Sequence, residues 1–137
     1  MKGRSLLFLR VSLGILMLLW GIDKLINVEH SQRVAENFYF GIGGGAAVLG
    51  VFGALELLLG VLVILGLLRQ YAYPALILIS LLTAVGVWKS ILDPWGWFIE
   101  GTNVLFYPSL IILAASVVLW AFVDQDKLSM DAKRGAP

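Results

Sequence analysis

Apolar residues fill four long runs of the chain, and short polar segments separate them. The runs cover about 5–26, 46–68, 74–92 and 104–123. A helix that crosses the hydrocarbon core of a bilayer needs about 20 residues, and each run is close to that length. The pattern therefore predicts an all-α fold, a four-transmembrane-helix up-down bundle that forms one domain over 1–124.

The longest polar segment between these runs covers 27–40. Glu29 and Arg33 are four residues apart, the spacing of an ion pair on a helix, and three aromatic residues end the segment. We therefore expect a short outer interfacial helix between the first and second spans. The glycine-rich stretch at 41–45 is not followed by the Lys-Ser/Thr of a phosphate-binding loop, so we interpret it as a flexible lead into the second helix.

Turn-forming residues mark the other connections and the end of the chain. We expect a tight turn at Pro74, between the second and third spans, and a turn at 93–97 whose tryptophans lie at the membrane interface. The last segment, 125–137, carries charges of both signs and ends in Gly-Ala-Pro. There we expect a polar, flexible cytoplasmic tail.

The composition narrows the classes of protein. Of the 137 residues, 60% are hydrophobic and 14% charged, whereas soluble domains average about 45–50% and about 25%. The chain has no cysteine and one histidine, so it can form neither disulfides nor thiolate metal sites, nor ligate a haem on both faces by itself. A net charge of +1 offers no basic surface for nucleic acid. We expect the lipid bilayer as partner, no nucleic acid, no metal site and no intrinsic cofactor.

Basic residues are distributed unevenly between the two sides of the predicted bundle. If both termini are cytoplasmic, the outer loops hold only Arg33, with Lys24 and Lys89 at outer helix ends. The positive-inside rule favours this orientation. The basic residues then assigned to the inner side are Lys2, Arg4, Arg10, Arg69, Lys127, Lys133 and Arg134.

Small residues form stripes on the first two predicted helices. Gly14 and Gly21 share one helical face with Arg10 and Lys24, and Gly53 and Gly60 share one with the acidic residue between them. Helices in a bilayer gain stability by close backbone approach, so we expect these glycines to pack helix against helix. The alternative is that they simply tolerate lipid. We expect Arg10 to extend to the cytoplasmic headgroups.

Glu56 lies near the middle of an apolar run, where an unpaired charge costs several kcal/mol. Side-chain directions predict that it meets Lys24 and Lys89 at the outer third of the bundle, with Asp23 as a second carboxylate. Two interpretations stay open. The cluster is either a ligand pocket for a quinone ring or an anionic metabolite, or an ion pair that fixes the helix register.

His30 belongs to the outer polar segment. It could accept a proton from a quinol or bind a metal with Glu29 or Glu36, but a lone surface histidine usually does neither. Interfacial anchoring accounts for the tryptophans that fall near the outer boundary better than an aromatic ligand cage does. These are Trp20, Trp88, Trp95 and Trp97.

Short motifs connect these features to a family. They are RVSLG at 10–14, WGIDKL at 20–25, ELLLG at 56–60 and LGLLR at 65–69. The pattern resembles the DoxX family of small bacterial membrane proteins, over about 9–92. The resemblance implies a place in the bacterial inner membrane and a link to membrane redox systems, since the family name comes from subunits associated with thiosulfate:quinone oxidoreductase. It assigns no residue a catalytic role.

The leading hypothesis is an accessory subunit of a membrane redox assembly that contacts quinone or lipid and is not catalytic alone. Its electron-transfer cofactor would belong to a partner, because the chain shows no site for one. Partners would be other membrane or redox subunits, or further copies of the chain in a homo-oligomer. Two alternatives remain: a transport element in which Glu56 carries a proton or pairs with a cationic substrate, and a purely structural scaffold.

Overall fold

A computed structural model describes residues 2–26, 29, 32–33 and 45–135. These residues form helices, turns and loops, with no strand among them. The longer helices are α1 (Lys2–Ile26), α3 (Ala46–Leu65), α4 (Arg69–Gly86) and α6 (Pro108–Ala121). The shorter elements are α5 (Trp88–Leu92), α7 (Met130–Lys133) and the 3-10 turns η1 (Val104–Phe106) and η2 (Val123–Gln125).

Membrane-spanning character is clear for three segments of the described chain. Lys2–Ile26, Val48–Leu65 and Val104–Ala121 are long and apolar enough to cross a bilayer. The all-helical expectation is confirmed. The four-span count stays a prediction, because α4 begins with the polar Arg69 and Gln70 and does not join this set. The predicted interfacial helix falls mainly on 27–28, 30–31 and 34–40, outside the described residues.

The connection between α3 and α4 lies earlier than the sequence suggested. Gly66 ends α3 in the left-handed conformation (φ 69°), and its N–H donates to carbonyls of the last turn. Leu68 is the one described non-glycine residue with positive φ, at 51°. Pro74, where we expected the turn, instead lies inside α4. The helix can start before it because the Asp131 carboxylate accepts a hydrogen bond from the Arg69 N–H (2.8 Å), one of the donors that a helix N-terminus leaves unpaired.

The third apolar run is also divided. Helix α4 ends at Gly86, Val87 leaves helical geometry (φ −107°), and α5 begins at Trp88. The expectation of one helix up to Leu92 is therefore wrong. Because of this break, the side chains from Trp88 onward point in other directions than they would on one continuous helix.

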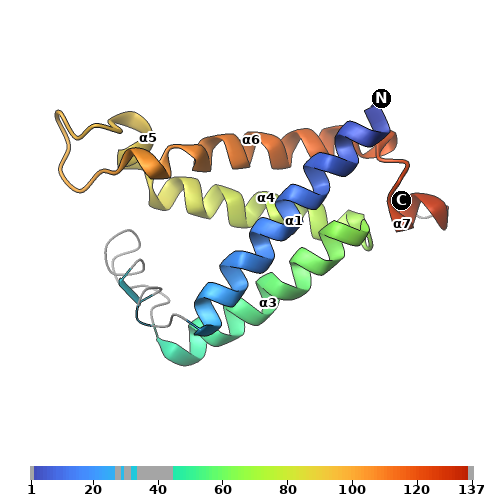
Figure 1. Ribbon diagram of the computed structural model, residues 1–137, viewed down its shortest axis with the longest axis horizontal. Helices are drawn as coiled ribbons and strands as arrows, with labels where there is room; N and C mark the ends of the chain where they lie inside the picture. Colours follow the sequence, from blue (N-terminus) through green and yellow to red (C-terminus); the bar gives the residue numbers. More distant parts are fainter. Residues whose placement is uncertain (1, 27–28, 30–31, 34–44, 136–137) are drawn as a thin grey trace.

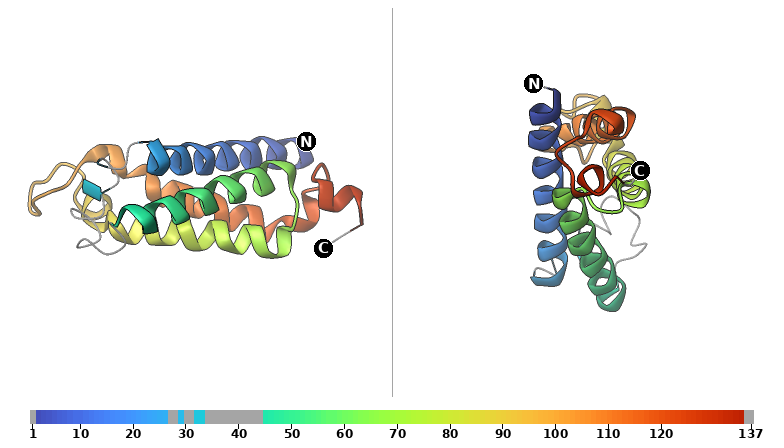
Figure 2. Two further views of the ribbon diagram at one scale, coloured as in Figure 1. Left: turned by 90° about the horizontal axis from the view of Figure 1, so that it is seen from below. Right: turned by 90° about the vertical axis from the view of Figure 1, so that its right-hand side faces the viewer.

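Glycines set the contact between α1 and α3, which lie side by side (Figures 1 and 2). A Cβ added to Gly14 would come within 2.9 Å of the Gly60 carbonyl oxygen, and one added to Gly60 within 2.8 Å of the Gly14 oxygen. Gly21 and Gly53 repeat this reciprocal contact at 2.7 and 2.9 Å. A step of seven residues up α1 thus matches a step of seven back along α3, as antiparallel helices require. The backbones touch where side chains would otherwise keep them apart.

Helices α4 and α6 form the second pair. Ser80 and Ser116 are fully buried, and their hydroxyl oxygens lie 3.1 Å apart across the interface. Figure 1 shows the α1/α3 pair and the α4/α6 pair close together near the chain termini and spread apart at the opposite end. Met17, Tyr73 and Leu119 belong to the buried apolar core that the two pairs share.

The glycine contact can be tested with an alanine pair on one helix. We expect Gly60→Ala to lower the free energy of unfolding by about 1–3 kcal/mol, because its methyl group would overlap the α1 backbone. Gly50→Ala is the matched control, since nothing lies within 4 Å of its Cβ position, and it should be neutral or slightly stabilising. Denaturant unfolding in detergent micelles measures both. Equal stability of the two variants would show that the interface is looser than described.

Candidate functional site

Glu56 and Lys24 form an ion pair at the end of the α1/α3 contact. The Lys24 Nζ lies 2.5 Å from the Glu56 Oε1. The close approach of Gly21 and Gly53 makes this pairing feasible, because the Cβ position of Gly53 is only 3.1 Å from the Cβ of Lys24. Glu56 is fully buried, whereas the Lys24 side chain is 23% exposed. The carboxylate predicted to need a partner thus has one, and the Lys24 side chain stays partly exposed.

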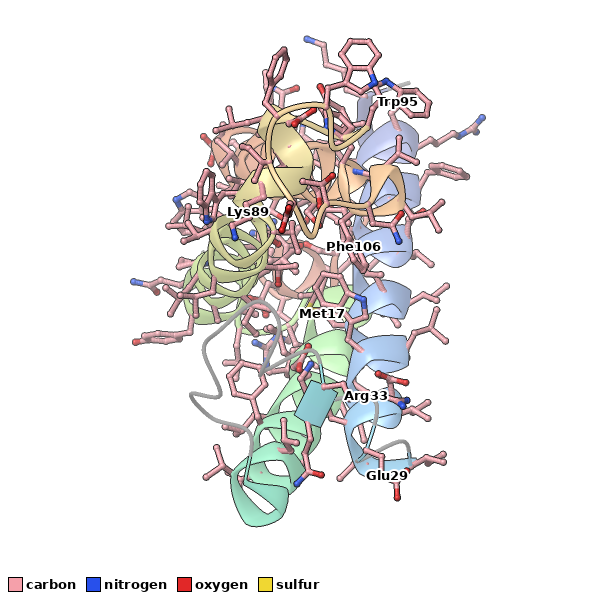
Figure 3. All side chains as sticks on the ribbon, turned by 90° about the vertical axis from the view of Figure 1, so that its left-hand side faces the viewer. Met17, Glu29, Arg33, Lys89, Trp95 and Phe106 are labelled. Carbon is pink, nitrogen blue, oxygen red and sulfur yellow. The ribbon has the colours of Figure 1, made fainter. Side chains whose placement is uncertain are left out.

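The other two predicted members of the cluster lie differently. Lys89 is exposed on α5, with its Nζ 5.9 Å from the centre of the Trp88 ring, and it forms no ion pair with Glu56. Figure 3 shows Lys89 beside α4 and α5, well to one side of α1. The break at Val87 and the spread of the two helix pairs account for this separation. Asp23 is half-buried next to Lys24 on α1.

His30 lies outside the described residues, so its role stays a prediction. Its described neighbours Glu29 and Arg33 appear in Figure 3 near the end of α1. Across the described part of the chain, no group of three or more histidine, aspartate or glutamate side chains is arranged to hold a metal ion.

An apolar hollow of about 330 Å³ lies on α3 next to the ion pair. Its lining residues are Val48, Val51, Phe52 and Leu55. The Lys24 ammonium connects the two features, because its Nζ lies 5.4 Å from the centre of the Phe52 ring. One Glu56 oxygen, Oε2, accepts no hydrogen bond from any described residue. An apolar hollow and a cationic donor thus lie beside a buried carboxylate oxygen without a hydrogen-bond donor, and the α3 residues involved span about two turns.

A second charged cluster, which we did not predict, lies at the end of the molecule that holds the termini. Asp126 is fully buried and accepts a hydrogen bond from the Tyr73 hydroxyl at 2.5 Å. Its two carboxylate oxygens lie 3.3 Å from the Arg10 Nε and 3.8 Å from an Arg69 Nη. Arg10 and Arg69 are themselves 1% and 6% exposed. Three parts of the chain therefore meet at one carboxylate.

Further hydrogen bonds tie the C-terminal segment to this cluster. Arg69 donates to the carbonyl oxygens of Val123 and Asp126, both at 3.1 Å, and Arg10 donates to the carbonyl of Ile64. Asp131 accepts from the Arg69 N–H and, at 2.9 Å, from the Arg134 guanidinium. These bonds satisfy only part of the network. The Arg10 Nε and Nη2 and the Asp126 Oδ1 are buried without a hydrogen bond from the described residues, and they depend on the ion pair between the two side chains.

Two expectations are corrected here. Arg10 does not extend to the headgroups, because the α3–α4 turn and the C-terminal segment cover it and provide a carboxylate. The expected flexible tail is instead packed, with Asp126, Ser129 and Asp131 buried and α7 formed beyond them. One signal could have indicated this. If both termini lie on the same side of the membrane, the acidic residues on that side are Asp124, Asp126 and Asp131. Arg10, an arginine inside the first apolar run, would take its counter-charge from among them.

Comparison with known proteins decides the family. A family model described as DoxX matches residues 5–89, more than half of the chain. The chain belongs to the DoxX family. No curated protein and no solved structure gave a significant match. The motif resemblance is thereby confirmed, and DoxX membership together with the apolar helices indicates a multi-pass membrane protein.

The residues matched by the DoxX model include all of the first charged cluster but only part of the second. Lys24 and Glu56 both lie inside the matched residues. Arg10, Arg69 and Tyr73 do too, but their carboxylate partner Asp126 lies beyond residue 89. The matched residues therefore contain the whole Lys24–Glu56 pair, whereas the second cluster takes its shared carboxylate from outside the match.

Removing the charge of Asp126 tests the second cluster. We expect Asp126→Asn to lower the free energy of unfolding by about 3–5 kcal/mol, because two buried arginines lose their shared counter-charge. Asp124→Asn is the matched control, because Asp124 is exposed on the 3-10 turn η2 that Asp126 ends, and it should change stability by less than about 0.5 kcal/mol. Thermal unfolding in detergent measures both. Similar values for the two variants would contradict a structural role for this carboxylate.

Acid should weaken the docking of the C-terminal segment. Burial acts to raise the pKa of Asp131, but hydrogen bonds from the Arg69 N–H and the Arg134 guanidinium outweigh it, so the pKa lies below its ordinary value of 3.8. The stabilisation is then fully present above that ordinary value and is lost as the pH falls through the lower, folded-state pKa. Unfolding midpoints measured from about pH 6 to about pH 2 should fall less steeply in Asp131→Asn than in the wild type. Parallel curves would refute this linkage.

Proposed function

We propose that this DoxX-family protein is an accessory subunit of a bacterial inner-membrane redox assembly, in which the Lys24–Glu56 pair contacts the head group of a quinone. The observation that carries the proposal is the 2.5 Å ion pair between a partly exposed lysine side chain and a buried carboxylate within a membrane-spanning pair of helices. Ionisable groups at such depth are costly and are typically found where a protein binds or moves something.

The chemistry of the pair suits both states of a quinone. The Lys24 ammonium can donate a hydrogen bond to a quinone carbonyl. The Glu56 Oε2 is buried and accepts no hydrogen bond from a described residue, so it can accept one from a quinol hydroxyl once the Lys24 side chain moves aside. The apolar hollow formed by Val48, Val51, Phe52 and Leu55 can hold the first part of an isoprenoid chain. The chain supplies contacts and leaves electron transfer to a partner subunit, which makes it an accessory subunit and not an enzyme by itself.

The proposed topology completes the four-helix bundle. Helix α4 has 18 residues, about 27 Å of helix, and lies alongside α6 with Ser80 buried between them. We assign it as the fourth span, so that the up-down arrangement places both termini on the cytoplasmic side. The basic residues near that end, among them Lys2, Arg4 and Arg69, support this orientation.

The transport alternative has less support. Between Arg10 and Lys24 the buried face of α1 carries Leu13, Gly14, Met17 and Gly21, with no ionisable side chain among them. The two charged clusters are therefore separated by an apolar layer. The scaffold alternative remains the second candidate, because the same ion pair also fixes the register of α1 against α3.

Quinone contact can be tested on the chain alone and on its assembly. A photoreactive quinone analogue should label the protein in lipid nanodiscs, and Lys24→Met should weaken its binding about 10- to 100-fold through loss of a charged hydrogen bond. Lys89→Met is the matched control and should bind normally, because Lys89 lies apart from the pair. The double variant Lys24→Met/Glu56→Gln avoids an unpaired buried charge if the single variant does not fold.

The assembly separates the alternatives. We expect Glu56→Gln to reduce the quinone-dependent turnover of the assembly purified through this chain while leaving its subunit composition intact. Unchanged turnover with poorer assembly would indicate a scaffold. Proton or substrate flux in liposomes that contain only this chain would indicate transport, and equal labelling of all variants would overturn the quinone proposal.

A further inference from the structure

The loop between α5 and η1, residues 93–103, is built around one carboxylate. Asp93 accepts hydrogen bonds from the backbone N–H groups of Trp97 (3.1 Å), Phe98 (2.6 Å) and Ile99 (2.8 Å). These bonds, led by the one from Phe98, lower the pKa of Asp93, as expected for a carboxylate held by several donors. At the base of the loop the buried Ser90 hydroxyl accepts from the Asn103 N–H at 3.0 Å. The loop thus has a defined shape.

Large apolar side chains form the surface of this loop. Trp95, Trp97 and Phe98 are 67%, 76% and 90% exposed. From 94 to 99 the sequence has no charged residue. Figure 1 shows the loop at the end of the molecule away from the termini, next to the outer ends of α4 and α6.

We infer that residues 95–98 insert into the headgroup and upper acyl region of the outer leaflet, so that the loop anchors the α4/α6 pair in the bilayer. A backbone that enters lipid must have its N–H groups satisfied internally, and Asp93 does this for three successive residues. Tryptophan and phenylalanine are the side chains best suited to that depth. A phospholipid surface is therefore the partner that this loop fits.

The lengths of the helices place the loop at the required depth. Helix α4 and the apolar segment Val104–Ala121 have 18 residues each and rise about 27 Å, close to the thickness of the hydrocarbon core, about 30 Å. The chain that joins these two segments, with the loop in it, therefore falls near the headgroups. Leu92 and Leu105, 72% and 76% exposed on the two sides of the loop, continue the apolar surface toward α5 and η1.

Spin labels can measure the depth directly, because the chain has no cysteine and single-cysteine variants need no background changes. A nitroxide on Phe98→Cys in phosphatidylcholine nanodiscs should collide with oxygen, which partitions into lipid, several-fold more often than with a water-soluble nickel complex. The control is a nitroxide on Lys127→Cys, exposed near the opposite end, which should show the reverse preference. A label on Phe98→Cys that prefers nickel would overturn the inference, and so would a label inaccessible to both, since that result means a protein contact.

A second pair of variants tests the role of the carboxylate. Asp93→Ala, which leaves three N–H groups without an acceptor, should shift the label on Phe98→Cys toward water and raise its nickel collisions at least about twofold. Glu100→Ala, in the same loop but with an exposed side chain, should leave the depth unchanged. If Asp93→Ala does not fold, the inference is tested by the depth of the label on Phe98→Cys in the otherwise wild-type chain. Equal depth in both variants would show that Asp93 does not prepare the loop for lipid.

Discussion

The carboxylate of Asp126 is the contact on which the assembly of this molecule depends. Arg10 on α1 and Arg69 on α4 are both buried, and a buried guanidinium without a counter-charge costs several kcal/mol. Asp126 meets both arginines and also accepts the Tyr73 hydroxyl. The C-terminal segment is therefore part of the folded domain, because it brings the charge that permits the first and second helix pairs to close together at that end.

A different constraint acts toward the other end of α1 and α3. There the glycines at 14, 21, 53 and 60 let two backbones touch, and this contact positions Lys24 against Glu56. The step of 14 residues from Arg10 to Lys24 corresponds to about 21 Å of helix, with only apolar or small residues between them on the buried face. The molecule thus carries two charged clusters separated by an apolar layer. This separation supports the proposed contact with a lipid-soluble ligand over the transport alternative.

Several parts of the fold and site were predictable because they depend on local pattern. Glu56 in an apolar run required a counter-charge, and Lys24 at the end of the neighbouring helix provides it. Lys89 did not join them, because the α4–α5 break at Val87 and the divergence of the helix pairs are set by packing and not by hydropathy. The prediction of a turn at Pro74 was wrong, because Gly66 ends α3 and the Asp131 carboxylate caps α4 at Arg69, five residues before the proline.

Membrane character, helical class and the glycine stripe follow from the amino-acid sequence, because hydropathy and helical spacing are properties of neighbouring residues. The pairing of charges, in contrast, depends on how distant segments pack. Arg10 and Asp126 are separated by nearly the whole chain, and their contact depends on how the α3–α4 turn and the C-terminal segment pack around them. Whether a charged side chain reaches water or becomes buried is decided by what covers it, and that cover comes from residues distant in sequence.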